Sequence, residues 1–360
     1  MPDLASDRKA FYHRVERRRT IARRLSRLRR KFAAPTKSHL AEVYDWGFRS
    51  DAEAVAFFYA RYNDHLPDLD NPTWLNEKIR WQFIHHPNPL ITLVADKIAV
   101  RDYIAFKGAT IPAPDLYFTT DDPAALATTP LPERFVLKPS FTTARVHIED
   151  GAKPTPPHEL AATAAAWSEH EIWAETGELH YRGIPKRWLV EELLPATRRK
   201  LEYKVFCFMG EPKYLLAITE RSAGTVKHVM LDCDWRRLPW KLDSSVQDDR
   251  EVARPESLDL LLEEARRLSA DFMHVRVDFL AFDDRLAFSE LTFADSAAVT
   301  RYEPHALNVE LGALMDLSRA SEYLERGRAV VAAMTSPPKP RKPVTASPSA
   351  RWLERRPDPG

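Results

Sequence analysis

The sequence has little glycine and little cysteine. Only 10 of its 360 residues are Gly, against 28 Pro, which argues against collagen-like chains and Gly/Ser linkers. It contains neither Gly-x-Gly-x-x-Gly nor Gly-x-x-x-x-Gly-Lys, so a nucleotide would have to bind without the two best-known phosphate loops. The two cysteines, Cys207 and Cys233, cannot form a disulfide framework or a four-ligand zinc site. We therefore expect two free thiols in a reducing compartment.

Long apolar runs are also lacking. No run approaches the roughly 18 residues that span a membrane. The Arg-rich N-terminal segment is not followed by the apolar stretch of a secretory signal. By elimination, the sequence predicts a cytoplasmic protein.

Basic charge is concentrated near the start of the chain. Residues 8–31 carry twelve Lys and Arg but one acidic residue, Glu16, whereas the long segment 32–335 is acidic overall. Four apolar residues within and just after this basic segment fall on one face of a helix, namely Ile21, Leu25, Leu28 and Phe32. Such a helix suits an anionic membrane surface, which would place the protein peripherally at the inner face of the membrane. Docking on the acidic body is the alternative, and nucleic acid is disfavoured because no interleaved aromatics follow.

The body alternates between helical and extended patterns. Helices are predicted over 51–63, 72–85, 91–107, 157–174, 255–271 and 303–324. Apolar runs predict strands over 134–138, 187–191, 203–208 and 213–219, with a hairpin turn at 210–212. This mixture indicates α+β lobes rather than a purely parallel sheet.

The segment 274–293 predicts a β-hairpin with two carboxylates on one face. A register symmetric about the middle of its polar turn places Asp278 opposite Glu290 and Arg276 opposite Thr292, unless a bulge in the turn slips the register. All four then share one face of the sheet because side chains alternate with period two. Nearer the turn, that face is predicted to be apolar, with Leu280, Phe282, Leu286 and Phe288.

Two directly opposed carboxylates destabilise a sheet unless something compensates their charge. A divalent cation fits, because Mg²⁺ prefers one or two carboxylates together with phosphates and water. Arg276 alone could also neutralise the pair. Both explanations remain open at this stage.

Lys138 ends another apolar strand, which is costly unless the ammonium group meets an anion or solvent. The loop 140–145 that follows is rich in hydroxyl groups and returns into a second strand at 146–148. A lysine at the mouth of such a strand–loop–strand unit can hold phosphates. The alternative is a lysine on an edge strand.

Four features follow one another along the chain: a strand lysine, a glutamate pair, an Arg-x-Asp and a Glu-x-Thr (Lys138; Glu191 and Glu192; Arg276 to Asp278; Glu290 to Thr292). This order resembles that of the ATP-grasp ligases, many of which have Asn at the position of Thr292. The closer resemblance is to the teichuronopeptide-biosynthesis TupA-like ATP-grasp family. It rests on ordered motifs at 67–81, 95–101, 135–139, 202–210, 231–239, 275–278 and 290–293.

The resemblance implies an ATP-grasp fold, in which two α+β lobes clasp ATP, preceded by a helical N-terminal region. The implied segments are a basic amphipathic helix over 1–40, a helical region that precedes the ATP-grasp domain over 41–130, the ATP-grasp domain itself over 131–330, and a Pro-rich disordered tail over 331–360. It also implies the cofactors ATP and Mg²⁺. Asp278 and Glu290 would bind Mg²⁺, with Thr292 as a third contact, while Lys97 and Lys138 would neutralise the phosphates.

Further roles are carried over on the same resemblance. Arg276 would stabilise charge on the transferred phosphoryl group, and Lys204 would contact a phosphate or carboxylate. The backbone around Glu191, Glu192 and Leu193 would face the adenine. Asp234 and Arg221 are candidates for the substrate side.

Two loops depart from the family pattern, because 140–145 and 294–298 contain no glycine. Lost glycine restricts positive φ angles and the close approach of backbone to phosphate. In the first loop, phosphate contacts would then come from side chains, namely Ser140, Thr142, Thr143 and Arg145.

The function implied is an ATP- and Mg²⁺-dependent carboxylate–amine ligase that acts through an acyl phosphate. Its setting would be the biosynthesis of a cell-surface polysaccharide, teichuronopeptide-like or capsule-like. The substrates would be a uronic acid or an amino acid on a glycan. The alternatives are a non-catalytic scaffold that binds nucleotide or glycan, and a sugar-directed phosphotransferase.

Overall fold

The computed structural model of the protein describes residues 4–34, 36–195, 200–222, 225–242, 245–282 and 285–336. Its larger sheet has the strand order β11-β10-β5-β6-β7-β9, antiparallel except between β7 and β9. The strands are β5 (Lys200–Phe208), β6 (Glu211–Ser222), β7 (Thr225–Asp232), β9 (Val246–Gln247), β10 (His274–Phe282) and β11 (Arg285–Thr292).

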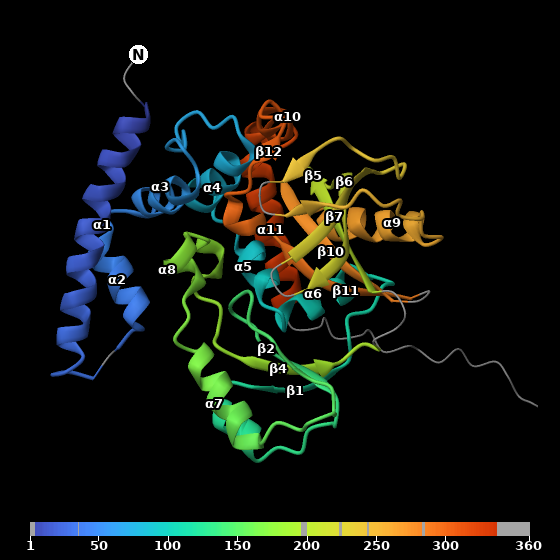
Figure 1. The fold of residues 1–360 in the computed structure, drawn as a ribbon, viewed down its shortest axis with the longest axis horizontal. Helices are drawn as coiled ribbons and strands as arrows, with labels where there is room; N and C mark the ends of the chain where they lie inside the picture. The colour runs from blue at the N-terminus through green and yellow to red at the C-terminus, as the bar shows by residue number, and fades with distance from the viewer. Residues whose placement is uncertain are drawn as a thin grey trace, which may run out of the picture.

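A smaller antiparallel sheet has the order β1-β4-β2-β3 and lies below the larger one in Figure 1. Its strands are β1 (Leu116–Thr120), β2 (Phe135–Pro139), β3 (His147–Glu149) and β4 (Trp188–Glu192). Two short strands, β8 (Lys241–Leu242) and β12 (Tyr302–Glu303), pair separately. The two larger sheets confirm the prediction of mixed α+β lobes.

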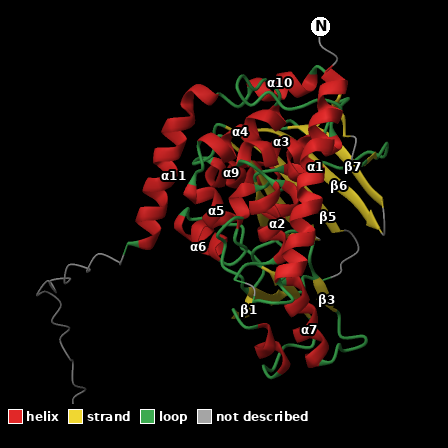
Figure 2. Ribbon diagram, turned by 90° about the vertical axis from the view of Figure 1, so that its left-hand side faces the viewer, coloured by secondary structure: helices red, strands yellow, loops and turns green. Residues whose placement is uncertain are grey.

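Each sheet packs against its own helices. The core of the larger lobe joins strands β5, β6, β7, β10 and β11 to α4 (Leu75–His85), α5 (Pro89–Ala95), α6 (Ala99–Phe106), α9 (Leu258–Ser269), α10 (Leu307–Ala313) and α11 (Ala320–Thr335). In Figure 2, α5, α6 and α11 lie on one side and the strands β5 to β7 on the other. The smaller sheet packs on α7 (Pro157–Trp167).

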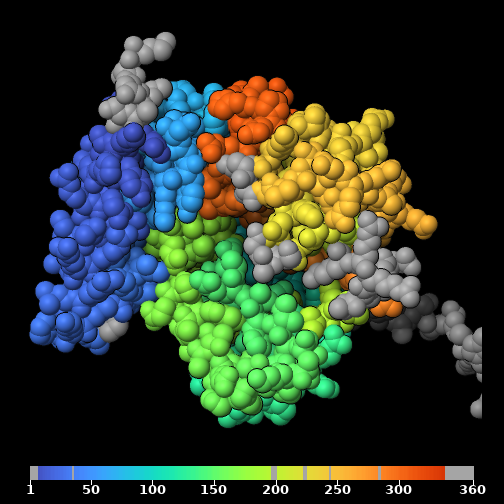
Figure 3. Space-filling view, in the orientation of Figure 1, coloured from blue at the N-terminus to red at the C-terminus, as the bar shows by residue number. Residues whose placement is uncertain are grey.

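A third apolar cluster joins the N-terminal helices. It contains residues of α1 (Leu4–Arg29), α2 (His39–Gly47), α3 (Asp51–Tyr62) and α8 (Ile172–Thr176). In Figure 3 this N-terminal segment forms one whole edge of the molecule. Among the described residues, no helix combines the length and apolar character needed to cross a membrane.

The helix predicted over 91–107 is two helices, α5 and α6, because the side chain of Asp96 interrupts it. Its Oδ1 accepts from the backbone N–H of Ile98 at 2.8 Å, and its Oδ2 pairs with Arg187 at 2.6 Å. An Asx-type contact of this kind ends one helix and starts the next. Lys97 consequently lies in the break between the two helices.

Other predicted boundaries also shift for local reasons. Helix α4 begins at Leu75 rather than at residue 72, because the carboxylate of Glu77 accepts from the N–H groups of Thr73 and Trp74, both at 3.0 Å. The segment 157–174 divides into α7 and α8, and 303–324 into α10 and α11. Helix α11 continues to Thr335, into the segment predicted as tail; residues 337–360 lie outside the described part of the chain.

The hairpin β10–β11 has the predicted register at its ionic end. Asp278 pairs with Glu290 and Arg276 with Thr292. A bulge after Asp278 then shifts the register by one residue, so that Phe279, not Leu280, pairs with Phe288. The predicted apolar face near the turn is therefore wrong. The predicted turn residues Asp283 and Asp284 lie outside the described residues.

Candidate active site

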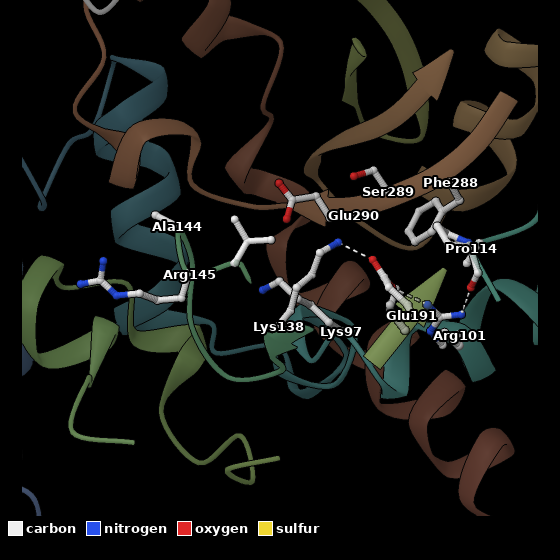
Figure 4. A pocket seen from close by; sticks show the side chains of 13 residues that line it. Lys97, Arg101, Pro114, Lys138, Ala144, Arg145, Glu191, Phe288, Ser289 and Glu290 are labelled. Carbon is white, nitrogen blue, oxygen red and sulfur yellow. Dashed lines mark hydrogen bonds and ion pairs between the residues drawn. The ribbon is translucent and has the colours of Figure 1, made fainter. Parts of the chain in front are cut away.

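The two sheets and the α5–α6 break bring charged residues from distant parts of the sequence around one cavity of about 250 Å³. Lys97 comes from the helix break, Lys138 from β2, Glu191 from β4 and Glu290 from β11. Figure 4 shows these four side chains gathered in this cavity. Lys97 and Lys138 carry the positive charge that an anionic ligand requires, and Glu290 carries the negative charge that a bound cation requires. All four residues were predicted from the sequence.

Glu191 is held by two cations. Lys138 pairs with its Oε1, and Arg101 donates from Nη2 to its Oε2 at 2.7 Å (Figure 4). Arg101 also donates to the carbonyl of Pro114 at 2.6 Å. The carboxylate of Glu191 is buried, so these pairs compensate a charge that would otherwise be costly to desolvate. Lys138 is therefore an inward-facing partner of a carboxylate, not an edge-strand lysine in solvent.

Lys97 ties the loop after β2 to the helix break. Its Nζ donates to the carbonyl of Thr142 at 2.6 Å, and its backbone N–H donates to the carbonyl of Ser140 at 3.3 Å. Burial lowers the pKa of Lys97, although Glu290 opposes this shift. A desolvated ammonium group next to the cavity is poised to gain from an incoming anion.

A second cavity, of about 330 Å³, shares Lys138, Glu191 and Glu290 with the first. Its other lining residues include Val136, Leu280 and the segment Glu191 to Leu194, together with Val146 and Ile148, which are 52% and 57% exposed. Exposed apolar residues beside charged ones are typical of a cleft for a flat, partly polar ligand such as a nucleotide base. The predicted adenine-facing residues Glu191, Glu192 and Leu193 do line this cavity.

Asp278 is bound by two cations from neighbouring strand positions. Arg276 donates from Nε to Oδ1 and from Nη2 to Oδ2, both at 2.7 Å, and Lys204 donates to Oδ2 at 2.8 Å. Burial raises the pKa of Asp278, but Arg276 and Lys204 outweigh it, and the net shift is downward. Asp278 is thus held ionised, and the carboxylate pair is already partly compensated without a metal.

Arg276 is the centre of a wider network. Besides Asp278 it pairs with Asp295, donates to the hydroxyl of Thr292 at 3.2 Å and lies 3.9 Å from the carboxylate of Glu290. Thr292 in turn donates to Glu290 at 3.3 Å. Arg276 is buried and held by a fork of carboxylates, so its guanidinium is fixed beside Glu290.

The donors present fit a magnesium ion that arrives with phosphates. The described residues contain no group of three or more His, Cys, Asp or Glu side chains that could hold a metal alone. The side chain of Glu290, however, is 40% exposed and borders three cavities, and within the described part of the chain its one hydrogen bond is the 3.3 Å contact from Thr292. Mg²⁺ takes one or two carboxylates and completes its shell with phosphates and water. Glu290 would be the main ligand, with Asp278 opposite it.

A third cavity, of about 170 Å³, is lined by Arg276 and Glu290. Thr143, Thr292 and Asp295 contribute to its wall, together with a buried carboxyl group, Glu178, that the sequence analysis did not select. Burial raises the pKa of Glu178 to about 7, against the opposing effects of a hydrogen bond from Thr176 and the charge of Arg80. A carboxyl group with such a pKa can exchange a proton near neutral pH.

Several predicted loop contacts point elsewhere. The hydroxyl of Ser140 faces the carbonyl of Pro185 at 3.4 Å, and buried Thr142 contributes its carbonyl to Lys97. Arg145 lines the first cavity, but its guanidinium extends away from the two lysines (Figure 4) and contacts His170 at 3.2 Å.

The two candidates for the substrate side differ. Arg221 lies at the second cavity, where it forms two 2.9 Å bonds to Glu202. Asp234 is exposed, pairs with Arg236 at 2.9 Å, and lines none of the three cavities.

The two loops without glycine adopt left-handed backbone all the same. Ala144 has φ 55°, and three consecutive residues, Ser296, Ala297 and Ala298, have φ 46°, 59° and 51°. The expectation that missing glycine restricts these loops to negative φ is therefore wrong. Buried Arg80 fixes the second loop by donating to the carbonyls of Ala297 and Ala298, at 2.6 and 3.3 Å.

Sequence reasoning missed three residues of the site: Arg101, Glu178 and Asp295. Arg101 had a usable signal, since it lies one helical turn after Lys97 in a motif that already carried the resemblance. Glu178 and Asp295 lie in irregular segments between regular elements, where no periodicity indicates what a side chain faces.

Solved structures of low sequence identity resemble this chain. Among solved structures, the D-alanine–D-alanine ligase from Bacillus anthracis is 14% identical, with 64% of this chain and 69% of that chain covered and a TM-score of 0.39. The ATP-grasp ligase PsnB with its minimal precursor is 13% identical, with 66% and 61% covered and a TM-score of 0.34. The chain thus spans less than two thirds of PsnB. A search of curated proteins found no match.

The comparison with protein families is more decisive. Residues 77–316 match the family described as TupA-like ATPgrasp. That range contains Lys97, Lys138, Glu191 and the hairpin β10–β11, and it spans about two thirds of the chain. The chain therefore belongs to the TupA-like ATP-grasp family and has the ATP-grasp fold.

Proposed function

We propose that the protein is an ATP- and Mg²⁺-dependent ligase that joins a carboxylate to an amine through an acyl phosphate. The observation that carries this proposal is the position of Glu290, which borders the first, the second and the third cavity. One carboxylate thus lies where a nucleotide, its phosphates and a second substrate would meet. Membership of the family supports the same reaction class.

The cationic residues of the site would neutralise the negative charge of ATP and of the transferred phosphoryl group. Lys97 and Lys138 offset the charge of the phosphates, and Arg276 offsets the charge that develops as the γ-phosphoryl group moves to the substrate carboxylate. Lys204 lines the second cavity, where it can contact a phosphate or a carboxylate. Magnesium at Glu290 and Asp278 would supply further charge neutralisation and hold the phosphates in line.

The second half-reaction needs an uncharged amine. The amine attacks the acyl carbon, a C–N bond forms, the bond from carbon to the phosphate oxygen breaks, and phosphate leaves. Glu178, in the third cavity, is placed to take the proton that the ammonium form must lose. This assigns the third cavity to the amine.

We assign the catalytic lobes to residues 131–330, with the helical region 41–130 completing the site through Lys97. For the substrates we propose a uronic acid or an amino acid on a glycan, in the biosynthesis of a cell-surface polysaccharide. Family membership supports this class. The location we propose is cytoplasmic, at the inner face of a membrane.

The first test is binding of ATP in the presence and absence of Mg²⁺, followed by ADP release with candidate uronic acids and amino acids. Asp278→Asn and Glu290→Gln should each lower Mg²⁺-dependent ATP binding or turnover at least roughly tenfold, the loss expected when a charged ligand is removed. Glu211→Gln is the matched control, because this exposed carboxylate pairs with Arg266 and lines none of the cavities. Absence of ATP binding at millimolar Mg·ATP would refute the proposal at its first step.

A non-catalytic binding scaffold is the second candidate. It is favoured by Asp278, whose two oxygens are already occupied by Arg276 and Lys204. A scaffold would bind nucleotide or glycan without releasing ADP. A phosphotransferase would release ADP but yield a phosphorylated sugar, which the product mass separates from an amide.

A further inference from the structure

Helix α1 has an inner and an outer face of opposite character. Its inner face packs on α2 and α3 through Val15, Arg19, Ala22 and Ser26, all of them buried. The guanidinium of Arg19 lies 4.8 to 5.1 Å from the ring centres of Phe48, Phe57 and Phe58, and burial lowers its pKa to about 10. The helix is therefore docked on the body, as one of the sequence alternatives proposed.

Half of the cations of the N-terminal segment have acceptors within the fold. Arg18 pairs with Glu53 at 2.5 Å, and Arg29 pairs with buried Glu42 at 2.6 Å. Acceptors on the body or on α1 itself engage six arginines in all, namely Arg8, Arg18, Arg19, Arg23, Arg29 and Arg30. These charges are compensated within the fold.

The outer face carries the predicted apolar stripe, and it is the stripe that stays in solvent. Ile21, Leu25, Leu28 and Phe32 are 57%, 51%, 52% and 82% exposed. Five cations of the same segment are exposed and have no ion pair among the described residues: Arg14, Arg17, Arg24, Arg27 and Lys31. We call these nine residues the outer face. In Figure 1, α1 lies at the edge of the molecule, away from both sheets.

We propose that the outer face binds an anionic lipid bilayer, with α1 lying in the plane of the interface. An exposed apolar stripe with cations beside it, and no acidic residue among the nine, fits the boundary between anionic headgroups and acyl chains. Burying the four apolar side chains removes them from water, and the cations remain at the level of the headgroups. A second copy of the chain is disfavoured, because apposing two outer faces would bring ten uncompensated cations together.

This inference deepens the proposed location and does not rest on the proposed ligase activity. No residue of α1 lines the three cavities of the active site. Changes to the outer face should therefore leave nucleotide binding unaltered, which separates a failed membrane contact from a misfolded or inactive protein.

The test is flotation of the full chain with vesicles of phosphatidylcholine alone or with 30% phosphatidylglycerol, roughly the anionic content that gives a marked surface potential. Binding is expected to the anionic vesicles only and to weaken as salt screens the charges. Two variants probe the two components: Leu25→Gln with Leu28→Gln, and a triple change of Arg24, Arg27 and Lys31 to Gln. Each should lower the partition coefficient at least roughly tenfold. A triple change of Lys153, Lys213 and Lys241 to Gln is the charge-matched control and should bind as the original chain does.

If the outer face binds something other than a bilayer, the same experiments give different results. If the chain is a dimer that the leucine variant converts to monomer while anionic vesicles do not bind, the outer face is an interface between copies and the proposal is wrong. Equal loss of binding in the lysine control would show that net charge alone is responsible, which also overturns it. Binding to a soluble polyanion that is independent of Leu25 and Leu28, without vesicle binding, would assign the face to an acidic macromolecule instead.

Discussion

Replacing Ala297 by glycine should stabilise the protein. Ala297 has φ 59° and ψ 29°, in the left-handed region, and both of its neighbours, Ser296 and Ala298, are left-handed as well. An L-residue with a β-carbon pays about 1–2 kcal/mol for this conformation, and glycine pays none of it. Glycine in turn gains about 0.4–1 kcal/mol of conformational freedom in the unfolded chain. The net expectation is a gain of about 0.5–1 kcal/mol.

A matched substitution in the same loop reverses the sign. Ala294 has φ −138° and ψ 84°, which alanine adopts without strain, so Ala294→Gly keeps only the unfavourable entropy and the loss of a buried methyl group. We expect it to destabilise by about 1 kcal/mol. The bond from Arg80 to the carbonyl of Ala297 is a backbone contact and survives the glycine substitution.

The assay is urea unfolding of the two variants beside the original chain, with the unfolding midpoint as the readout. A difference of about 1.5–2 kcal/mol between the variants is expected, with the original chain between them. If Ala297→Gly is destabilising to the same degree as Ala294→Gly, the loop is not strained at Ala297, and the reasoning from its left-handed backbone fails.

Two further substitutions test the electrostatics of the site. Because burial raises the pKa of Glu178 from 4.5 to about 7, the original chain should lose about 3 kcal/mol of stability relative to Glu178→Gln as the pH rises from 4.5 through 7. Urea unfolding at several pH values measures this, and a relative gain with rising pH would contradict it. Arg101→Met should cost about 2 kcal/mol, since buried Glu191 keeps only Lys138. Exposed Arg134→Met is its control and should change stability by less than about 0.5 kcal/mol.

The hairpin β10–β11 shows how far alternation along a strand can be used. Period-two alternation about a short polar turn was enough to predict that Asp278 faces Glu290, and the structure confirms it. A bulge was conceivable in the turn, but its position after Asp278 was beyond this reasoning, because no local propensity indicates where one extra residue enters a strand. It is decided by the packing of Phe279 and Phe288, which are both buried in the larger core.

The breaks between helices show a different limit. The periodicity over 91–107 is helical throughout, yet Asp96 ends α5 because its carboxylate binds Arg187, far along the chain, and caps α6. The position of Lys97 in the cavity follows from that one contact. Residues 91–107 alone cannot predict the break between α5 and α6, because Arg187 lies outside that segment.

The sequence by itself determined the ordered motifs, and with them the α+β class, the family and most charged residues around the cavities. These follow from residue type and spacing, which local propensity and alternation translate into strands and turns. Tertiary structure decided the rest, because partners far apart in sequence set it. It fixed which residues hold Glu191, that Glu178 borders the site, and that four residues in two glycine-free loops are left-handed. It also decided which face of α1 is covered: Arg19 and its small neighbours fit the aromatic cluster of α2 and α3, and the apolar stripe is left outside.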